Sequence, residues 1–193
     1  MLSSKLANYN IILASGSPRR QHFLKDLHID FEIRVKEVDE IYPNHLKGIE
    51  ITDYLATLKS KPFENELTEK DILITSDTIV WHQNKALGKP KDYDEAFEML
   101  WQLSGKTHEV ITSVCIKNKN FQKIVNDTTI VEFKKLSKEE IDYYITNYRP
   151  YDKAGAYGIQ EWIGKIGIKT IKGSYFNVVG LPVHKLYEEL MKL

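Results

Sequence analysis

Two long segments rich in β-branched residues, joined by a short polar turn, constrain the fold of this chain more than any other feature. Residues 107–118 read THEVITSVCIKN, residues 122–136 read QKIVNDTTIVEFKKL, and the polar turn KNKN at 117–120 joins them. Val, Ile and Thr favour strands, and two such runs separated by a few polar residues predict an antiparallel hairpin. The hairpin excludes a purely parallel sheet, whatever the rest of the chain forms.

Helical and strand patterns alternate along the rest of the chain. Apolar or alternating runs predict strands within 11–13, 31–38 and 71–83, with a turn or hairpin over 84–92. Apolar spacing and end signals predict helices over 49–67, 92–105, 137–148 and 181–193, the last with Pro182 in its first turn. The glycine-dotted segment 152–175 is expected to mix loop and short strands. The predicted fold class is α/β with a mixed sheet.

Length, charge and cysteine content limit the classes of function. The 193 residues fit one domain spanning 1–193, and 27 Lys and Arg balance 27 Asp and Glu. Zero net charge argues against nucleic acid or a membrane surface as a partner. The lone Cys115 fits a reducing compartment, and residues 1–10 contain no apolar signal core. We therefore expect a cytoplasmic protein.

The stretch LASGSPRR, residues 13–20, predicts a strand, a small-residue turn and a helix that begins with two arginines. Ser17 suits the N-cap and Pro18 the first helical position. A helix N-terminus disfavours cations, so Arg19 and Arg20 are misplaced there unless an anion lies nearby. The residues leave two interpretations open, a phosphate site and an ordinary turn with surface arginines.

Acidic residues indicate a second candidate site. Asp77 stands in LITSDTIVW, where a carboxylate within an apolar strand is costly unless it is paired or binds metal. We expect Asp77 near the carboxyl end of its strand, where ligands gather in open α/β sheets. Glu40 lies in the acidic run EVDE, which fits either a solvated loop or a Mg²⁺ ligand beside phosphates. Lys59 and Lys89 are further phosphate candidates, although most lysines are ordinary surface residues.

Taken in order, seven motifs resemble the Maf family of nucleoside triphosphate pyrophosphatases. They are LASGSPRR, EVDE, LATLKSK, SDTIVWHQNKALGKPKD, AFEMLWQLSGKTHEVITSV, DKAGAYGIQ and GSYFNVVGLP. They cover nearly the whole chain, from about residue 11 to residue 184. The resemblance implies a single α/β domain with an elongated, twisted mixed sheet, flanking helices and a deep cleft, as in inosine triphosphate pyrophosphatases.

The resemblance also assigns roles to individual residues. It implies that Asp77 is the catalytic base and that Glu40 and Asp77 hold a divalent metal, Mg²⁺, Mn²⁺ or Co²⁺. It implies further that the substrate is bound by Ser15, Arg19, Arg20, Lys59, Thr78, Lys89 and Gln160. Arg19, Thr78 and Gln160 fall on positions that distinguish substrate classes, and SPRR, SDT and GIQ resemble the subfamily acting on dTTP and UTP.

The expected reaction is hydrolysis of a nucleoside triphosphate to the monophosphate and pyrophosphate by water attack on the α-phosphorus. One alternative is a nucleotide-binding regulator of cell division with little turnover. An aspartyl-phosphate phosphatase is disfavoured because SDTIV lacks the D-x-D pair that such an enzyme needs. The natural substrate could be a modified pyrimidine nucleotide, and the oligomeric state is open, with a homodimer as one alternative.

Overall fold

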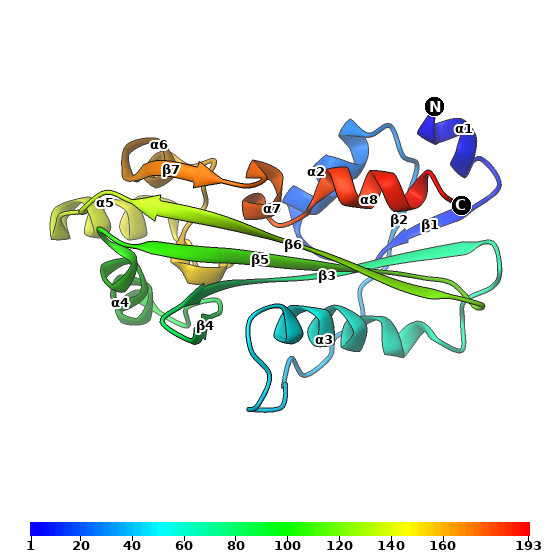
Figure 1. Ribbon diagram of the computed structural model, residues 1–193, viewed down its shortest axis with the longest axis horizontal. Helices are drawn as coiled ribbons and strands as arrows, with labels where there is room; N and C mark the ends of the chain where they lie inside the picture. The colour runs from blue at the N-terminus through cyan, green and yellow to red at the C-terminus, as the bar shows by residue number, and fades with distance from the viewer. The chain divides into compact units, whose positions relative to one another are not determined.

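The computed structural model describes residues 1–193, and its strands form one seven-stranded mixed sheet (Figure 1). The strand order is β2-β1-β3-β5-β6-β7, and β4 pairs with β3 outside this path. The pairs β1–β2 and β1–β3 are parallel, whereas β3–β4 and β6–β7 are antiparallel. The strands are β1 (Asn10–Leu13), β2 (Glu32–Ile33), β3 (Asp71–His82), β4 (Lys85–Leu87), β5 (Thr107–Lys117), β6 (Gln122–Phe133) and β7 (Ile168–Lys172). The predicted α/β class with a mixed sheet is confirmed.

The predicted hairpin corresponds to β5 and β6, which are neighbours in the sheet. The side chain of Asn118 closes the turn between them, because its Oδ1 accepts hydrogen bonds from the backbone N–H groups of Asn120 and Phe121 at 2.8 and 2.9 Å. An asparagine that bonds its own backbone two or three residues on is a common way to build such a turn. The polar turn sequence therefore has a direct structural role.

The helices that follow Ser17, Asp92 and Ser137 begin where their end signals predict. The α-helices are α1 (Leu2–Leu6), α2 (Pro18–Asp26), α3 (Ile49–Ser60), α4 (Tyr93–Leu103), α5 (Lys138–Tyr148), α6 (Trp162–Gly167), α7 (Tyr175–Val179) and α8 (Val183–Leu190), with short 3₁₀ turns at Lys61–Phe63 and Ala154–Ala156. Asp92 caps α4 by accepting from the Glu95 N–H at 2.9 Å, and Ser137 with Glu140 forms a reciprocal capping box at α5. Pro182 occupies the N-cap position of α8 rather than its first turn.

Three segments differ from the sequence-based prediction. The helix expected over 49–67 ends at Ser60, and a 3₁₀ turn follows it. The strand expected over 31–38 contracts to Glu32–Ile33, an edge strand that pairs only with the end of β1. The glycine-dotted segment forms the helix α6 as well as β7. Position 164 of this helix requires glycine, because a Cβ there would lie 1.9 Å from the carbonyl oxygen of Ile159. The glycine permits close packing of α6 on the preceding backbone instead of breaking the helix.

The chain divides into two compact units, each assembled from separate segments. Unit 1 contains Met1–Asp77, Thr112–Asp127 and Gly180–Leu193, and unit 2 contains Thr78–Ile111 and Thr128–Val179. The strands β3, β5 and β6 contribute residues to both units. The organisation of 1–193 as a single domain stays a prediction. None of the helices has the length and apolar content that crossing a membrane requires.

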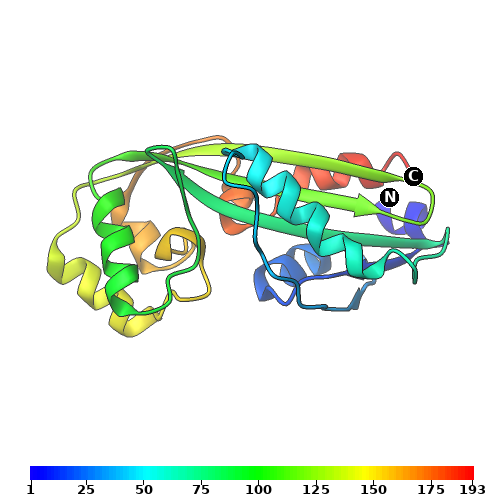
Figure 2. The same cartoon turned by 90° about the horizontal axis from the view of Figure 1, so that it is seen from below.

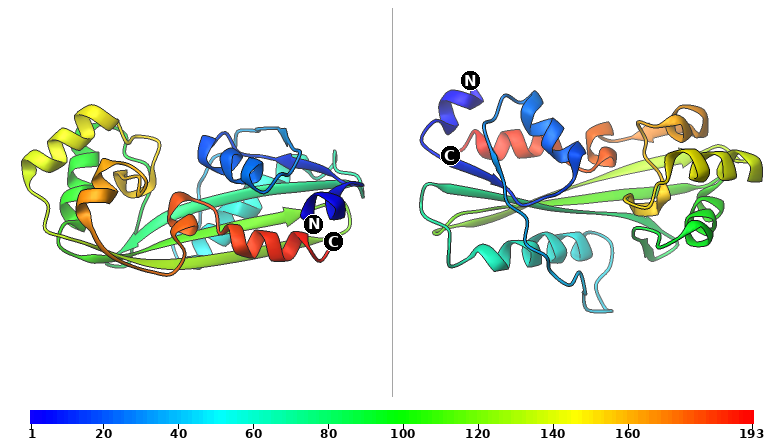
Figure 3. Two further views of the ribbon diagram at one scale, coloured as in Figure 1. Left: turned by 90° about the horizontal axis from the view of Figure 1, so that it is seen from above. Right: turned by 180° about the vertical axis from the view of Figure 1, so that it is seen from behind.

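In unit 1, helix α3 covers one face of the strands, and α2 and α8 cover the other (Figure 1, and from behind in Figure 3). In unit 2, α4 packs against α5, and the two lie side by side when seen from below (Figure 2). The core of unit 2 includes the fully buried side chains of Leu100, Phe133, Tyr144 and Ile163. Apolar side chains thus hold the helices of unit 2 on its strands.

Candidate active site

Asp77 lies inside β3 rather than near its carboxyl end, which corrects the sequence-based expectation. The first part of β3 pairs with β1 as far as Ile74, and its last part pairs with β4 from Val80 to His82. The strand therefore continues beyond the end of β1, and Asp77 falls between the two paired regions. Only 5% of Asp77 is exposed to solvent. A carboxylate at such a position needs a cationic partner.

Lys59 supplies that partner. It lies in the last turn of α3, and its Nζ is 2.7 Å from Oδ1 of Asp77. The same ammonium is 3.1 Å from Oε1 of Glu40, in the acidic run after β2. A cation in the last turn is also favoured by the helix dipole. One buried acid and one half-exposed acid thus converge on a single positive charge.

Opposing influences set the proton affinity of Asp77. Burial raises the pKa of its carboxyl, since the charged form loses its hydration, and the nearby Glu40 raises the pKa further. The charges of Lys59 and Arg20 and the hydrogen bond from Lys59 lower it, but the net pKa remains above the ordinary aspartate value. A raised pKa makes this carboxylate a better proton acceptor than an exposed aspartate.

Arg20 joins three segments of unit 1 through its guanidinium. Its Nε donates to the Gly180 carbonyl at 2.9 Å, and its Nη1 donates to the Ser76 carbonyl at 2.9 Å and to Ser15 Oγ at 3.3 Å. Burial lowers the pKa of Arg20 to about 10, and the charge of Asp77 opposes this shift. The Arg20 side chain therefore stays positively charged at neutral pH, close enough to Asp77 for the two charges to interact.

The start of α2 has the predicted residues but no side-chain capping bond. Ser17 is the N-cap and Pro18 is the first helical residue, yet the Ser17 side chain makes no capping hydrogen bond. Instead, the Ser17 N–H donates to Ser15 Oγ at 3.3 Å. An added Cβ on Gly16 would meet no atom within 4 Å, so the turn before α2 borders open space. That space leaves room for an anion at the helix N-terminus.

The structure brings five of the residues singled out in the sequence into one group in unit 1: Ser15, Arg20, Lys59, Asp77 and Glu40. Arg19 belongs to the same unit, one residue before Arg20 on α2. Thr78, Lys89 and Gln160 belong to unit 2. Thr78 directly follows Asp77 on β3, and Lys89 is exposed in the segment after β4.

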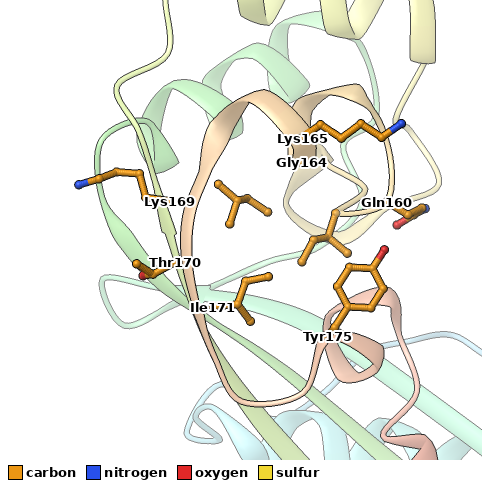
Figure 4. Close-up of a pocket in the computed structure, with 9 residues that line it drawn as sticks. Gln160, Gly164, Lys165, Lys169, Thr170, Ile171 and Tyr175 are labelled. Atoms are coloured by element: carbon orange, nitrogen blue, oxygen red, sulfur yellow. The ribbon is translucent and has the colours of Figure 1, made fainter.

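Gln160 lines a cavity of about 400 Å³ that lies wholly within unit 2 (Figure 4). Apolar side chains of Ile159, Ile168 and Ile171 form much of its wall. The Tyr175 hydroxyl points toward the Gln160 side chain (Figure 4). Oε1 of Gln160 is buried and has no hydrogen-bond partner. A buried acceptor without a partner indicates a place where a ligand could donate a hydrogen bond.

Sequence reasoning missed the backbone acceptors of this site. The carbonyls of Ser76 and Gly180 orient Arg20, but a carbonyl exists at every residue and gives no signal in a sequence. Tyr175 was also missed as a cavity residue, although it stands in the motif GSYFNVVGLP. That motif was the only available signal for both Tyr175 and Gly180.

Asp77 and Glu40 fit a divalent metal in their chemistry. Both carboxylates reach one cationic atom, Lys59 Nζ, so their oxygens already converge. No group of three or more His, Cys, Asp and Glu side chains is arranged to hold a metal ion. Two carboxylates suffice for Mg²⁺, which commonly takes its remaining ligands from water and substrate phosphates. The donor set therefore fits a hard metal that binds together with a phosphate substrate.

Sequence comparisons match nearly the whole chain to known proteins. The family model described as Maf-like protein matches residues 10–193. The dTTP/UTP pyrophosphatase of Flavobacterium psychrophilum is 62% identical over 191 residues, which cover 99% of this chain and 98% of that protein. The dTTP/UTP pyrophosphatase of Flavobacterium johnsoniae is 62% identical over 193 residues and 100% of both chains. Among solved structures, the Staphylococcus aureus Ham1 protein overlaps 64% of this chain and 71% of its own, at 15% identity and a TM-score of 0.48.

Proposed function

Because this chain belongs to the Maf family, we propose that it is a pyrophosphatase that hydrolyses dTTP and UTP to the monophosphate and pyrophosphate. Relatives at 62% identity over almost their whole length bear the name dTTP/UTP pyrophosphatase. The structural observation that carries the proposal is the buried Asp77 carboxylate, which contacts the Lys59 ammonium and feels the charge of Arg20. An acid beside two cations suits water activation next to bound phosphates.

Asp77 is the proton acceptor in this proposal. A water oxygen attacks the α-phosphorus while its proton passes to the Asp77 carboxylate. The bond between the α-phosphorus and the oxygen that bridges to the β-phosphorus then breaks, and pyrophosphate leaves. Burial raises the Asp77 pKa, which makes the carboxylate a stronger base for this transfer.

The cations neutralise the triphosphate. Arg20 is held by two backbone carbonyls and Ser15, so its position is set before substrate binds. Phosphate oxygens compete with Asp77 and Glu40 for the Lys59 ammonium, and this competition frees the Asp77 carboxylate to act on water. Lys89 is proposed as a further phosphate ligand. Preorganised cations of this kind stabilise charge that develops in the transition state.

A divalent metal, Mg²⁺, Mn²⁺ or Co²⁺, would be held by Asp77 and Glu40. When bound, it would supply Lewis-acid stabilisation of the phosphate oxygens. A carboxylate that also holds a metal is a weaker base, so Asp77 would then act more by orienting the attacking water. Glu40 is the more exposed of the two acids and the easier one to reach from solvent.

Gln160, Thr78 and Arg19 are proposed to select the nucleotide. The Gln160 carboxamide has both a donor and an acceptor, which matches the adjacent carbonyl and N–H groups of uracil and thymine. Its buried Oε1 has no partner, which supports a role as an acceptor for the base. Thr78 follows the candidate base Asp77 on β3, and Arg19 precedes the phosphate-binding Arg20 on α2. A modified pyrimidine nucleotide could occupy the same place.

The proposal includes a single functional domain over 1–193 that works in the cytoplasm with a nucleotide as its partner. Balanced charge and a single cysteine, Cys115, support this location and argue against nucleic-acid and membrane partners. Size-exclusion chromatography with light scattering distinguishes a monomer from a homodimer.

The decisive test is product analysis with dTTP, UTP and a panel of other common and modified triphosphates, each with Mg²⁺, Mn²⁺ or Co²⁺. We expect pyrophosphate and the monophosphate, fastest with the two pyrimidine nucleotides. Release of orthophosphate and a diphosphate would contradict the assigned bond. Micromolar binding by calorimetry without metal-dependent turnover would instead support the alternative of a nucleotide-binding regulator.

A further inference from the structure

A buried tyrosine lies directly behind the loop that carries Gln160. Tyr144 on α5 is completely buried, and its ring stacks on that of Tyr148 at 5.1 Å between centroids. Its hydroxyl accepts a hydrogen bond from the Gly158 N–H at 3.0 Å and donates one to Oε2 of Glu161. Residues 158 and 161 flank Gln160, so one hydroxyl group holds the loop on both sides of the candidate base-reading residue.

The Tyr144 hydroxyl remains protonated at neutral pH. Burial and the hydrogen bond to Glu161 raise the pKa of Tyr144 well above its ordinary value. The hydroxyl has one hydrogen and donates it to Glu161, while its oxygen accepts from Gly158. Both contacts of the hydroxyl are therefore defined.

Glu161 is held from its other oxygen as well. Its Oε1 lies 3.0 Å from Nζ of Lys153, a buried lysine that also lies 2.6 Å from Oδ1 of Asp152. The chain Tyr144–Glu161–Lys153 is thus a polar network in which each named group has a partner. Buried networks of this kind hold side chains in one arrangement when every member is satisfied.

Close packing of the backbone limits the loop further. A Cβ on Gly158 would lie 3.0 Å from Nε2 of Gln160 and 2.9 Å from Cδ of Glu161. On the other side, Gly164 allows α6 to approach the carbonyl of Ile159. The Gln160 carboxamide therefore rests on the glycine backbone that Tyr144 anchors, and its Oε1 stays buried and without a partner.

We propose that Tyr144 is a positioning residue for nucleobase selection, which acts through Gly158 and Glu161 to set the place of the Gln160 carboxamide. The inference rests on the proposed role of Gln160 as the residue that contacts the base. Tyr144 does not itself touch the nucleotide in this proposal. Its loss leaves the Gly158 N–H without its partner and releases Glu161, so the loop and its carboxamide move together.

A double-mutant cycle tests the proposal in the full-length protein. Four proteins are compared by kcat/KM for UTP and for GTP: the unaltered chain, Tyr144→Phe, Gln160→Ala and the combined variant. We expect Tyr144→Phe to reduce the UTP-to-GTP ratio by about tenfold, as for one misplaced buried hydrogen bond. In the Gln160→Ala background, the same change should alter the ratio by less than about twofold, since the group through which it acts is gone.

A second readout separates the base from the phosphates. Inorganic tripolyphosphate carries the phosphate charge without a base, and its inhibition constant should be the same in the unaltered protein and in Tyr144→Phe. Tyr157→Phe is the matched control, because it also removes a buried hydroxyl, one that contacts His108 at 2.7 Å and neither Gly158 nor Glu161. It should lower thermal stability and leave the UTP-to-GTP ratio unchanged.

The outcomes separate this inference from the proposed function. If Gln160→Ala lowers the ratio but Tyr144→Phe does not, the positioning role is overturned and the base-reading role of Gln160 stands. If Gln160→Ala has no effect on the ratio, both are overturned. If Tyr144→Phe fails to fold, Glu161→Ala replaces it, because this partly exposed residue can be removed while the Tyr144 hydroxyl keeps Gly158. The double-mutant cycle of Glu161→Ala with Gln160→Ala must then show the same reduction of the UTP-to-GTP ratio.

Discussion

The ammonium of Lys59 lies 2.7 Å from the carboxylate of Asp77, and both side chains are largely buried. Removing one partner of such a pair leaves the other as an uncompensated buried charge, which is far more costly than the pair itself. The pair therefore ties the proton affinity of the candidate base to the cation that is proposed to bind phosphate. A substitution at Lys59 is therefore expected to change the proton affinity of Asp77 as well.

Asp77→Asn should reduce turnover of dTTP and UTP by more than about a hundredfold, the lower end of what a positioned general base contributes. The amide keeps the shape of the carboxylate and cannot accept the proton from water. Pyrophosphate release measures the effect, and circular dichroism confirms that the variant is folded. Asp71→Asn on the same strand is the control, because Asp71 contacts Thr68 and Asn10 outside the candidate site. Near-normal turnover of Asp77→Asn would remove this residue from the mechanism.

Lys59→Met should move the acidic limb of the pH profile of kcat/KM to higher pH. Lys59 lowers the pKa of Asp77 against the effect of burial, so its removal lets that pKa rise further. The base is then protonated at a higher pH, and activity is lost earlier as the pH falls. Lys61→Met, at an exposed position, should leave the limb in place. An unchanged limb in Lys59→Met would mean that Asp77 does not set the acidic limb.

Arg20→Lys should raise KM for UTP and lower the stability of the fold. A lysine has one ammonium and cannot reproduce a fork that reaches the carbonyls of Gly180 and Ser76 together. Carbonyls that lose a buried hydrogen bond cost about 1–3 kcal/mol. Thermal denaturation measures the stability, and Arg34→Lys, in an exposed pair with Glu32, provides the comparison. Equal melting temperatures for Arg20→Lys and the unaltered chain would contradict the anchoring role.

Gln160→Glu should reduce discrimination between pyrimidine and purine nucleotides by about tenfold or more, because a pyrimidine carbonyl would face a carboxylate instead of an amide donor. The substitution keeps an acceptor and removes both donors. The measurement is kcat/KM for UTP and dTTP against GTP and 7-methyl-GTP. Gln102→Glu, exposed on α4, adds the same charge away from the cavity. Fixed ratios with retained activity would show that Gln160 does not read the base.

Stability should fall in acid because of His108 in unit 2. Its Nε2 lies 2.7 Å from the Tyr157 hydroxyl, and burial, with a smaller effect of His82, lowers its pKa to about 3. The unfolded chain binds a proton near pH 6.5 and the folded chain does not, so this contribution is complete above pH 6.5 and declines toward pH 3. The decline is at most about 1.4 kcal/mol per pH unit for one group.

His108→Asn should flatten this pH dependence, as measured by urea denaturation at a series of pH values between 3 and 7. Part of the slope should remain, because burial also lowers the pKa of His82. His22→Asn, at an exposed position on α2, is the control substitution. A full slope in His108→Asn would assign the acid sensitivity to other groups.

Local features of this protein were readable from the sequence because their causes lie within a few residues. The caps at Asp92 and Ser137 each bond a backbone N–H three residues away, and the hairpin turn at Asn118 is closed from its own side chain. The motif resemblance also singled out Asp77, Lys59 and Arg20 before their contacts were known. Strand length was less predictable, since pairing partners decided that β2 is short and that β3 continues past Asp77.

Only the tertiary structure decided which residues meet. The Lys59–Asp77 pair joins positions 18 residues apart, and the Arg20–Gly180 bond joins positions 160 apart, through a carbonyl that no side-chain pattern marks. Tyr144 likewise reaches the loop of Gln160 only in the folded chain. Its hydroxyl bonds the Gly158 N–H and the Glu161 carboxylate, which lie 14 and 17 residues farther along the sequence. The raised pKa of Asp77 likewise depends on burial and on neighbouring charges, which exist only once the chain has folded.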